Sequence, residues 1–462
     1  MNKLNSIGII GLGVMGKALT ENLLEKKISV SVYNRSTNKE KHVISNFIST
    51  NKHITDLKGF TKLLPFIKSL KQPRKIILML PAGKIIDTIL KSLNDLLITN
   101  DIIIDCGNSN YKDAKKRSDF LSKNKIEFID CGISGGQEGA KKGPSIMIGG
   151  KKTNYIKIKS FLQTISAKDN NNLSCCAHMG GLGSGHYVKM IHNGIEYGEM
   201  QLIAETFSLL KIHHNYNQIA NIFEEWNKTE HSSFLLKATI NILREKNNEN
   251  THILDTILDE AKSKGTGVWA SKEGLNIASS NSIMISSVMA RNLSLNKTLR
   301  EKMNLKRNKT DNSINLNSLK EAFIMARIIN HHQGFQLLLK ASSLYNWKME
   351  ISEIARIWTN GSIIKSNLMI ELIRLMKKNS NILKINSVFK DLIKKEKSIK
   401  KLILFATQNS IPVNCYSSAY NFWISITSKS LNANLIQAQR DYFGNHGYID
   451  IEKNSFKNYN WH

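Results

Sequence analysis

The sequence predicts an α/β plus all-α fold: a doubly wound, mainly parallel sheet in residues 1–180, then a large helical domain in residues 181–434. Three features support this division. A glycine-rich turn follows the first apolar segment, short apolar segments alternate with helical ones early in the chain, and no proline occurs between Pro144 and Pro412. Alternating strands and helices are typical of doubly wound sheets. The span between Pro144 and Pro412 is expected to be all-α, because amphipathic patterns without proline fill most of it. Residues 435–462 are expected to form a separate tail.

The first predicted strand, 7–10, leads into a glycine-rich turn and then into an apolar helix that runs through Leu24. A strand, the pattern G-x-G-x-x-G and a helix in this order are typical of Rossmann-like dinucleotide-binding domains. The glycines allow a tight turn and close approach of a pyrophosphate, which binds the amides at the helix start. An incidental glycine turn is the alternative. The residues expected to contact the cofactor here are Gly11, Leu12, Gly13, Val14, Met15 and Gly16.

The second predicted strand, 28–33, ends in Asn34, Arg35 and Ser36. NAD-binding proteins usually place an acidic residue there for the ribose hydroxyls, and this chain has none at that position. Arg35 can instead pair with a 2′-phosphate and stack on adenine. The predicted cofactor is therefore NADP, whereas a surface arginine in a turn is the alternative.

Three further strands are predicted at 76–80, 102–105 and 128–130. In such sheets the ligand groups project from loops at the carboxyl ends of the strands. Two loops there are chemically suggestive, 106–109 and 134–139. The side chains of Asn108 and Ser134 can hydrogen-bond hydroxyls or a carboxylate, and the amides of Gly135 and Gly136 can face an anion. Taken alone, each loop is equally compatible with an ordinary turn.

A long, largely buried helix is predicted from Ser184 to Leu210, opened by another glycine-rich turn. One face of it carries four polar residues at i, i+3, i+4 and i+7. Burial lowers the pKa of a lysine, and the positive end of the helix dipole acts in the same direction, so a free amine becomes available as a base. A carboxyl two turns away supplies the complementary acid. A solvated polar stripe is the alternative reading of Lys189, His192, Asn193 and Glu196.

The helical part is predicted to be internally doubled, because residues 193–205 resemble residues 329–341. In the second copy Met325 stands where Lys189 would be, and His332 where Glu196 would be. Chemistry is therefore expected in one half only.

Other polar segments of the helical part are candidates for anion or metal binding. The segment Lys264-Gly265-Thr266-Gly267, expected between helices, has the composition of a phosphate nest, and Arg291 is a second candidate anion ligand or a snorkelling surface residue. His252, Asp255 and Asp259 are expected to share a helix face, which we interpret as solvated rather than as a metal site. Segment 437–447 breaks helical periodicity and carries Arg, His and aromatic residues, so we expect it to dock on a partner subunit.

The composition indicates a protein with a strongly basic surface. The formal net charge is +28, but the lysines and arginines are scattered, which favours attraction of phosphorylated ligands over a specific nucleic-acid site. The five cysteines form no C-x-x-C pattern, so we expect reduced thiols and a cytoplasmic location. No apolar run is long enough to span a membrane, and the first strand leaves no room for a signal peptide.

Together these motifs resemble the 6-phosphogluconate dehydrogenase (decarboxylating) family of the β-hydroxyacid dehydrogenase superfamily. The resemblance rests on Gly185-His186-Tyr187-Val188-Lys189-Met190 through Tyr197, on segment 264–267, and on Ala438-Gln439-Arg440-Asp441-Tyr442-Phe443-Gly444. It implies oxidative decarboxylation of 6-phospho-D-gluconate to D-ribulose 5-phosphate and carbon dioxide, the gluconate-using step of the pentose phosphate pathway. It also implies reduction of NADP, no metal, and a homodimer with shared active sites.

The resemblance also implies residue roles. Lys189 would take the proton of the 3-hydroxyl and then polarise the 3-keto group, and Glu196 would protonate the enediol at C1. The substrate contacts implied are Asn108, Ser134, Gly135, Gly136, His192 and Asn193, and the phosphate contacts are Tyr197, Lys264, Thr266 and Arg291, joined by Arg440 and His446 of the other subunit. Further cofactor contacts are expected at Leu80, Pro81, Ala82 and Asn108, although the family usually has Val-Lys-Ala-Gly where this chain has Leu80-Pro81-Ala82-Gly83.

Two alternatives stay open. A dehydrogenase of the same fold group that acts on an unphosphorylated acid would lack the set of phosphate ligands and would turn over gluconate as well as 6-phosphogluconate. A non-catalytic polyanion-binding protein would show salt-sensitive binding to nucleic acid and no reaction with NADP.

Overall fold

Eight strands form a single sheet in the order β3-β2-β1-β4-β5-β6-β7-β8. The computed structural model describes residues 4–263, 265–307, 310 and 313–461. All neighbouring strands are parallel except β6 and β7, so the predicted mainly parallel sheet is confirmed. The strands are β1 (Ile7–Ile10), β2 (Val30–Tyr33), β3 (Leu57–Phe60), β4 (Lys75–Leu78), β5 (Ile102–Asp105), β6 (Glu127–Ser134), β7 (Ser145–Gly149) and β8 (Cys176–Gly180).

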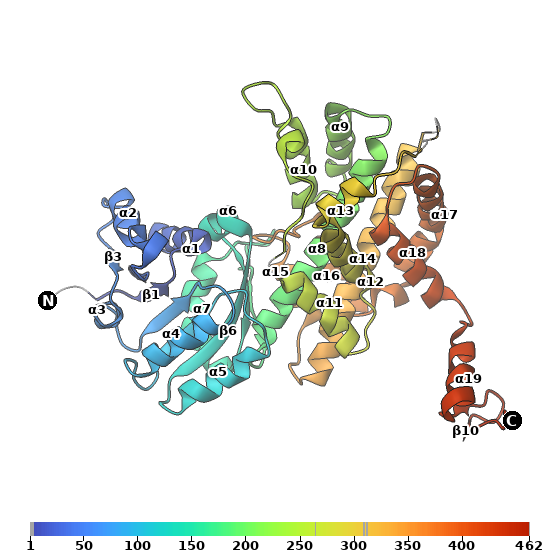
Figure 1. Cartoon of the computed structure of the whole chain (residues 1–462). Helices are drawn as coiled ribbons and strands as arrows, with labels where there is room; N and C mark the ends of the chain where they lie inside the picture. Colours follow the sequence, from blue (N-terminus) through green and yellow to red (C-terminus); the bar gives the residue numbers. More distant parts are fainter. Residues whose placement is uncertain (1–3, 264, 308–309, 311–312, 462) are drawn as a thin grey trace.

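Helices cover both faces of this sheet. Alternate strand residues point to opposite faces and pack against different helices. Ile9, on β1, belongs to the hydrophobic cluster under α1 and α7, whereas its neighbour Ile10 belongs to the cluster under α3, α4 and α5. The residues of β4 and β5 alternate in the same way. The helices of this domain are α1 (Val14–Glu25), α2 (Val43–Thr50), α3 (Leu63–Lys68), α4 (Lys84–Asn94), α5 (Asp113–Ser122), α6 (Gly136–Lys142) and α7 (Lys152–Ile165), with the short 3-10 helix η1 (Asn38–Glu40) (Figure 1).

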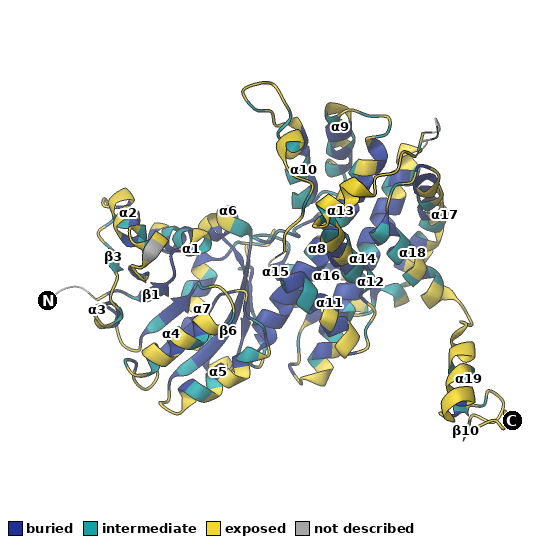
Figure 2. Cartoon of the chain, in the orientation of Figure 1, coloured by how far each residue is buried: buried dark blue, intermediate teal, exposed yellow. Residues whose placement is uncertain are grey.

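The rest of the chain is helical, and the helix α8 (Ser184–Leu210) has the bounds that the sequence predicts. It is buried along most of its length (Figure 2), although Met200 lies at the surface. The other helices are α9 (Tyr216–Asn227), α10 (Phe234–Arg244), α11 (Thr266–Asn276), α12 (Ser282–Ser294), α13 (Lys297–Lys302), α14 (Leu316–Leu344), α15 (Ile351–Ile357), α16 (Asn367–Lys378), α17 (Asn386–Gln408), α18 (Asn414–Thr427) and α19 (Ala433–Gly444), with 3-10 helices η2 (Ile253–Thr256) and η3 (Ile382–Lys384).

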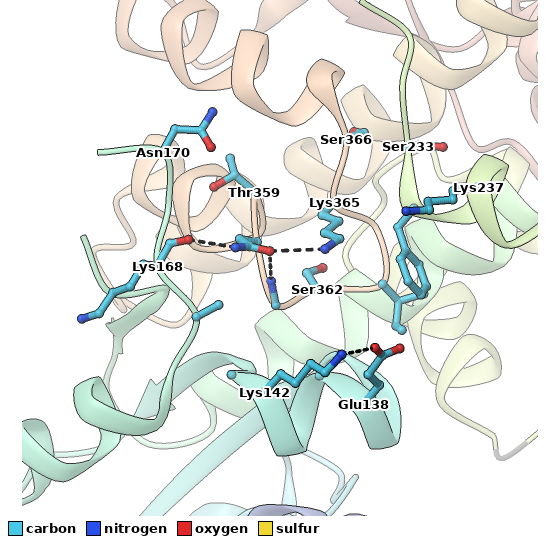
Figure 3. A pocket seen from close by; sticks show the side chains of 18 of the residues that line it. Glu138, Lys142, Lys168, Asn170, Ser233, Lys237, Thr359, Ser362, Lys365 and Ser366 are labelled. Atoms are coloured by element: carbon cyan, nitrogen blue, oxygen red, sulfur yellow. Dashed lines mark hydrogen bonds and ion pairs between the residues drawn. The ribbon is translucent and has the colours of Figure 1, made fainter. Parts of the chain in front are cut away.

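A polar cleft separates the α/β and helical domains on one side (Figure 3). Helix α6 forms one wall of this cleft, and segment 359–370 and the start of α10 form the opposite wall.

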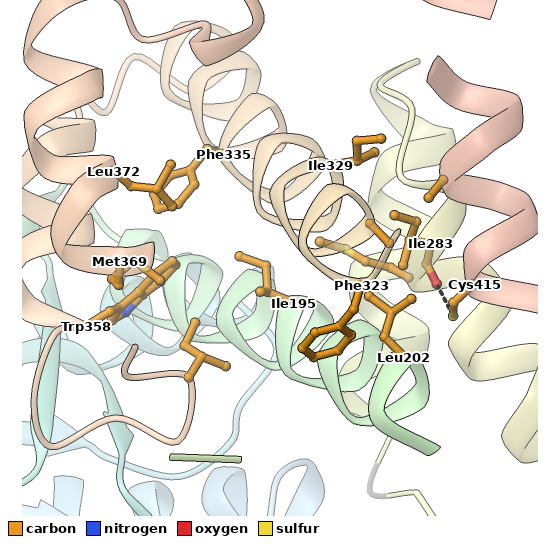
Figure 4. Close-up of a cluster of buried hydrophobic side chains, with 14 of the residues drawn as sticks. Ile195, Leu202, Ile283, Phe323, Ile329, Phe335, Trp358, Met369, Leu372 and Cys415 are labelled. Atoms are coloured by element: carbon orange, nitrogen blue, oxygen red, sulfur yellow. Dashed lines mark hydrogen bonds between the residues drawn. The ribbon is translucent and has the colours of Figure 1, made fainter. Parts of the chain in front are cut away.

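The two similar segments lie on two long helices, α8 and α14, which pack against each other in the hydrophobic core (Figure 4). Their equivalent glycines both make close contacts: a Cβ on Gly198 would lie 2.4 Å from Oδ1 of Asn330, and a Cβ on Gly334 would lie 2.5 Å from Cδ1 of Ile195. Both glycines thus allow the two long helices to approach closely, and the internal duplication stays a prediction.

Three predictions about local structure are wrong. The proline-free span begins with two strands, β7 and β8, rather than with helix. His252, Asp255 and Asp259 share no α-helix face, because only 253–256 form a 3-10 turn and Asp259 instead pairs with Lys297 and Arg300 at 2.7 Å each. Among the described residues, no group of three or more His, Cys, Asp or Glu is placed to hold a metal ion.

The third correction concerns the tail. The sequence predicts a break in helical periodicity over segment 437–447, but most of this segment belongs to α19, and the hairpin of β9 (Tyr448–Ile449) and β10 (Phe456–Lys457) follows. Asp441 holds the helix and hairpin together by accepting hydrogen bonds from the backbone of Gly447 and Tyr459 and from Nε1 of Trp461. This unit extends away from the rest of the chain (Figure 1).

The cysteines agree with the expectation of reduced thiols. All five cysteines are free and buried. None of the helices in the described ranges is long and apolar enough to span a bilayer.

Candidate active site

Lys189 lies where α8 presses against β6. A Cβ on Gly132 of β6 would lie 2.4 Å from Cβ of Lys189, so only glycine allows this approach. The lysine is 8% exposed, which confirms the predicted burial. Burial lowers the pKa of Lys189 to about 8, although the carboxylate of Glu196 acts in the opposite direction. An amine with this pKa exists largely as ammonium at neutral pH and still provides an appreciable free-base fraction.

His192 connects the residues of this face. Its Nε2 lies 2.8 Å from the hydroxyl of Ser134 and 2.8 Å from that of Ser362, and its Nδ1 lies 3.5 Å from Nζ of Lys189 and 3.6 Å from Oε2 of Glu196. Burial, and then the charge of Lys189, lower the pKa of His192 well below its ordinary value. The imidazole is therefore neutral at pH 7 and serves as a hydrogen-bonding group rather than as a charge.

Glu196 has the opposite electrostatic character. Burial raises the pKa of its carboxyl, against the lowering effects of Lys189 and Arg291. A carboxyl that retains its proton more readily than usual can act as a general acid. The same helix face thus presents an amine with a lowered pKa and a carboxyl with a raised pKa.

Three segments bring further predicted residues to this point. Asn108 from the loop after β5, Thr266 at the start of α11, and Lys189 and Asn193 from α8 line one small hollow. Thr266 begins a helix, so the expectation of a loop between helices is wrong at this residue, but Gly265 before it has a φ of +89° and forms the turn. Lys264 lies outside the described residues.

Tyr197 and Arg291 also lie together. The guanidinium carbon of Arg291 is 3.7 Å from the centre of the Tyr197 ring, a cation–π contact that holds this arginine over α8. A Cβ on Gly267 would lie 2.4 Å from the same ring. The tyrosine, the arginine and the first turn of α11 therefore form one surface.

The predicted loop 134–139 differs from expectation. Ser134 ends β6, Gly135 is the turn with a φ of +120°, and Gly136 begins α6. The hydroxyl of Ser134 nevertheless reaches His192, so this side chain does join the site.

Two buried aspartates fix the loops of the site, and neither was predicted from the sequence. Asp130 accepts hydrogen bonds from the backbone of Gly183 and His186 at 2.8 and 3.0 Å, which places a negative charge at the start of α8. Asp105 accepts from the Gly107 amide and the Ser109 hydroxyl, and so shapes the loop that carries Asn108. Arg117 compensates Asp105 at 3.1 Å. Both aspartates lie at the ends of predicted strands, and this position is the feature of the sequence that could have identified them.

The glycine-rich turn after β1 fits a dinucleotide pyrophosphate. Gly11 has a φ of +100°, and a Cβ on Gly16 would lie 2.0 Å from the carbonyl oxygen of Gly11, so both positions require glycine. Gly13 faces open space and precedes α1 without any side-chain cap, which leaves the first amides of the helix available to an anion. The backbone amide of Leu12 donates to Oδ1 of Asn34 at 3.0 Å and joins this turn to the end of β2.

Beyond Asn34 the structure adds an acidic residue. Arg35 donates from Nε and Nη2 to the carboxylate of Glu40 at 2.9 Å each, and Asn34 donates to the same carboxylate at 3.0 Å. Glu40 lies in η1, seven residues after the end of β2. It is therefore not at the end of the strand, where NAD-binding proteins usually carry an acidic residue. The arginine predicted to bind a 2′-phosphate is therefore paired with a carboxylate in this structure.

Four further predicted residues are exposed at the surface. Pro81 and Ala82 are exposed in the loop after β4. Arg440 and His446 are exposed on α19 and just beyond it, within the tail that extends from the helical domain. Within one chain the structure does not bring these two residues to Tyr197.

An open glycine turn for a dinucleotide, next to a buried lysine with a carboxyl partner, defines a nucleotide-dependent dehydrogenase with a helical second domain. Residues 6–181 match the NAD binding domain of 6-phosphogluconate dehydrogenase, and residues 185–461 match the C-terminal domain of 6-phosphogluconate dehydrogenase. The chain therefore belongs to the 6-phosphogluconate dehydrogenase family.

Individual relatives agree along the whole chain. It is 37% identical to the decarboxylating 6-phosphogluconate dehydrogenase of Lactococcus lactis, over 99% of this chain and 98% of the relative, and 38% identical to that of Salmonella typhimurium, over 98% of each. A solved structure of Plasmodium falciparum 6-phosphogluconate dehydrogenase, studied without ligand, with its cofactor NADP+ and with its substrate 6-phosphogluconate, superposes with a TM-score of 0.92 at 34% identity. That match covers 99% of this chain and 100% of the other.

Proposed function

We propose that this chain is an NADP-dependent 6-phosphogluconate dehydrogenase, which converts 6-phospho-D-gluconate to D-ribulose 5-phosphate and carbon dioxide. The observation that carries the proposal is the buried amine of Lys189 on the same helix face as Glu196, in the hollow lined by Asn108 and Asn193. Family membership supports the choice of substrate, and the cytoplasm is the location that suits five reduced thiols.

Lys189 acts in this proposal first as a base and then as an acid. Its free amine takes the proton of the substrate's 3-hydroxyl, and the bound NADP supplies the acceptor for the hydride that leaves C3. The resulting ammonium then polarises the 3-keto group, so the electrons released with carbon dioxide have an acceptor. Glu196, whose carboxyl has a pKa raised by burial, protonates C1 of the enediol.

The neighbouring polar groups orient the substrate. Asn108, Ser134 and the amides of Gly135 and Gly136 are assigned to its carboxylate and hydroxyls, together with His192 and Asn193. The surface of Tyr197, Thr266 and Arg291 is suited to the phosphate, because it combines a hydroxyl, a helix start and a guanidinium. Lys264 is assigned to the same phosphate from the sequence.

The cofactor binds at the glycine turn and at the end of β2. Gly11, Leu12, Gly13, Val14, Met15 and Gly16 hold the pyrophosphate, Asn34, Arg35 and Ser36 hold the adenosine end, and Leu80, Pro81, Ala82 and Asn108 border the nicotinamide. When NADP binds, its 2′-phosphate must replace Glu40 as the partner of Arg35.

A second copy of the chain completes the site in this proposal. The chain is divided into an NADP-binding domain (residues 1–180), a substrate and dimer domain (residues 181–434) and a tail (residues 435–462). Many of the tail's large apolar side chains are exposed, which supports this division because such side chains favour contact with another protein surface. Arg440 and His446 then reach the phosphate of the partner's substrate.

The test is a spectrophotometric assay at about 340 nm, the absorbance of the reduced nicotinamide, with 6-phosphogluconate and NADP and parallel detection of carbon dioxide. Reduction of NADP with release of carbon dioxide is expected. Equal turnover of gluconate would instead favour an unphosphorylated hydroxyacid as substrate. No reaction, together with salt-sensitive binding to nucleic acid, would favour the polyanion-binding alternative.

A further inference from the structure

The cleft of Figure 3 is largely unused by the proposed chemistry, which assigns only the Gly135 amide of its lining to the substrate. Its volume is about 1150 Å³, enough for a ligand of nucleotide size. One wall comes from the α/β domain, including α6 and the end of α7, and the other comes from α10 and segment 359–370 of the helical domain. A ligand in this cleft would touch both domains at once.

The charges that line the cleft are strongly unbalanced. Five lysines line it against one glutamate, a surplus of four positive charges. The one carboxylate, Glu138, is already paired with Lys142 at 2.7 Å, and Lys142, Lys365 and Lys237 all lower its pKa. Glu138 therefore stays ionised and neutralises only part of the field. The lysines are Lys26, Lys142 and Lys168 on one wall and Lys237 and Lys365 on the other.

Helix ends of both signs face the cleft. Helices α10 and α16 both begin inside the cleft, at Ser233 and Ser366, which are joined by a β-bridge. Helix starts carry a partial positive charge and helix ends a partial negative one. Helices α1, α6 and α7 end in the same cleft, at Lys26, Gly143 and Ser166, so the surplus of positive charge comes from the lysines. The remaining lining is mainly Ser, Thr and Asn, which donate hydrogen bonds and provide no further negative charge.

The cleft adjoins the candidate active site and shares Gly135 with the proposed substrate contacts. Ser362 lines the cleft, and its hydroxyl lies 2.8 Å from Nε2 of His192. The backbone amide of Ile363, another lining residue, lies 3.4 Å from the hydroxyl of Ser134. Lys189, Asn108 and Thr266 line a different hollow. One layer of side chains thus separates the two spaces.

We propose that this cleft binds a small polyanion with two or more linked phosphoryl groups. One phosphate group cannot neutralise a surplus of four charges, whereas a chain of phosphoryl groups can. Such a ligand holds the α/β domain against the helical domain and changes the setting of Ser362 beside His192. Its binding does not depend on which sugar acid the enzyme oxidises.

The experiment is calorimetric titration of the full-length protein with inorganic triphosphate, with orthophosphate as the weaker comparison. Saturating NADPH and 6-phosphogluconate, which cannot turn over together, fill the other anion sites. We expect one triphosphate per chain, bound more tightly than orthophosphate. The double variant Lys237→Gln/Lys365→Gln should weaken it about tenfold or more.

The matched control is Lys377→Gln/Lys378→Gln, which removes two exposed lysines from the far end of α16. It should retain the wild-type affinity. The single variant Lys237→Gln, at an exposed position, should bind triphosphate with an affinity between those of the double variant and the control. It keeps the test valid if the double variant does not fold. The proposal is overturned if all variants bind triphosphate equally well, or if the control loses as much affinity as the double variant. It is also overturned if NADPH and 6-phosphogluconate displace triphosphate completely.

Discussion

Replacement of Lys189 by methionine is expected to inactivate the enzyme and to stabilise it. The buried amine has a pKa of about 8 instead of 10.5. This shift corresponds to roughly 3 kcal/mol, by which burial disfavours the charged form. Methionine fills a similar volume and carries no charge, so at neutral pH the variant should gain up to that amount of unfolding free energy while it loses the base.

The pH dependence of this stability follows from linkage. Between pH 8 and 10.5 the unfolded chain binds the lysine proton and the folded chain does not, so wild-type stability rises with pH across this window. The stability advantage of Lys189→Met should therefore be full below pH 8 and should disappear by about pH 10.5. Urea unfolding at several pH values measures it, with Lys91→Met, at an exposed position of α4, as the control.

The same pKa sets the activity profile of the wild type. At a pH of about 7.5, roughly a quarter of Lys189 is free base, about two-hundredfold more than for an ordinary lysine. The value of kcat/KM should rise with pH and level off near pH 8. Because the Glu196 carboxylate raises this pKa, Glu196→Gln should move the rise to lower pH. If the rise of kcat/KM in Glu196→Gln stays at the same pH or moves to higher pH, this account of the site is refuted. It is also refuted if Lys189→Met is less stable than the wild type.

The other predictions concern the cofactor, the helix contact and the tail. Arg35→Asp should raise the KM for NADP at least about tenfold more than that for NAD, since it removes charge-assisted bonds to the 2′-phosphate; equal changes would contradict that assignment. Glu40→Gln should lower the KM for NADP about threefold, as expected for removal of an exposed competing carboxylate, and a higher KM would show that Glu40 orients Arg35 instead. Gly132→Ala should reduce both thermal stability and kcat, because the new methyl group collides with Lys189; an unchanged melting temperature would contradict the close contact. Deletion of the residues after Ala433 should abolish activity and weaken dimerisation in ultracentrifugation, whereas an active truncated monomer would rule out a shared site.

Features with a local signal could be predicted from the sequence. The bounds of α8 follow from glycines before it and 27 residues of helical apolar spacing, and the face of Lys189 and Glu196 follows from the same spacing. The strand β1 and its glycine turn are equally local. In contrast, β3 contains Lys58 and Gly59 and lacks a continuous apolar run, so nothing in its four residues distinguishes it from a loop.

Residues that act through distant contacts could not be predicted. Ser362 is 170 positions from His192 and lies in a turn, so its hydrogen bond to the imidazole depends on tertiary packing alone. Glu40 reaches Arg35 only because η1 turns the chain back. Helical spacing identifies a face of α8, but it does not identify the second element that meets this face.

The origin of the proposed base is the close packing of two backbones. A Cβ on Gly185 would lie 2.6 Å from the carbonyl oxygen of Met147 and 2.7 Å from that of Asp130, and Gly132 is equally restricted beside Lys189. Because both elements carry glycine where they meet, α8 contacts the sheet without intervening side chains, and little water reaches the lysine. The same approach brings the Asp130 carboxylate to the first amides of α8, which stabilises the helix start. Desolvation of the amine and anchoring of the helix that carries it are thus two consequences of one contact, so a larger residue at either glycine should affect both together.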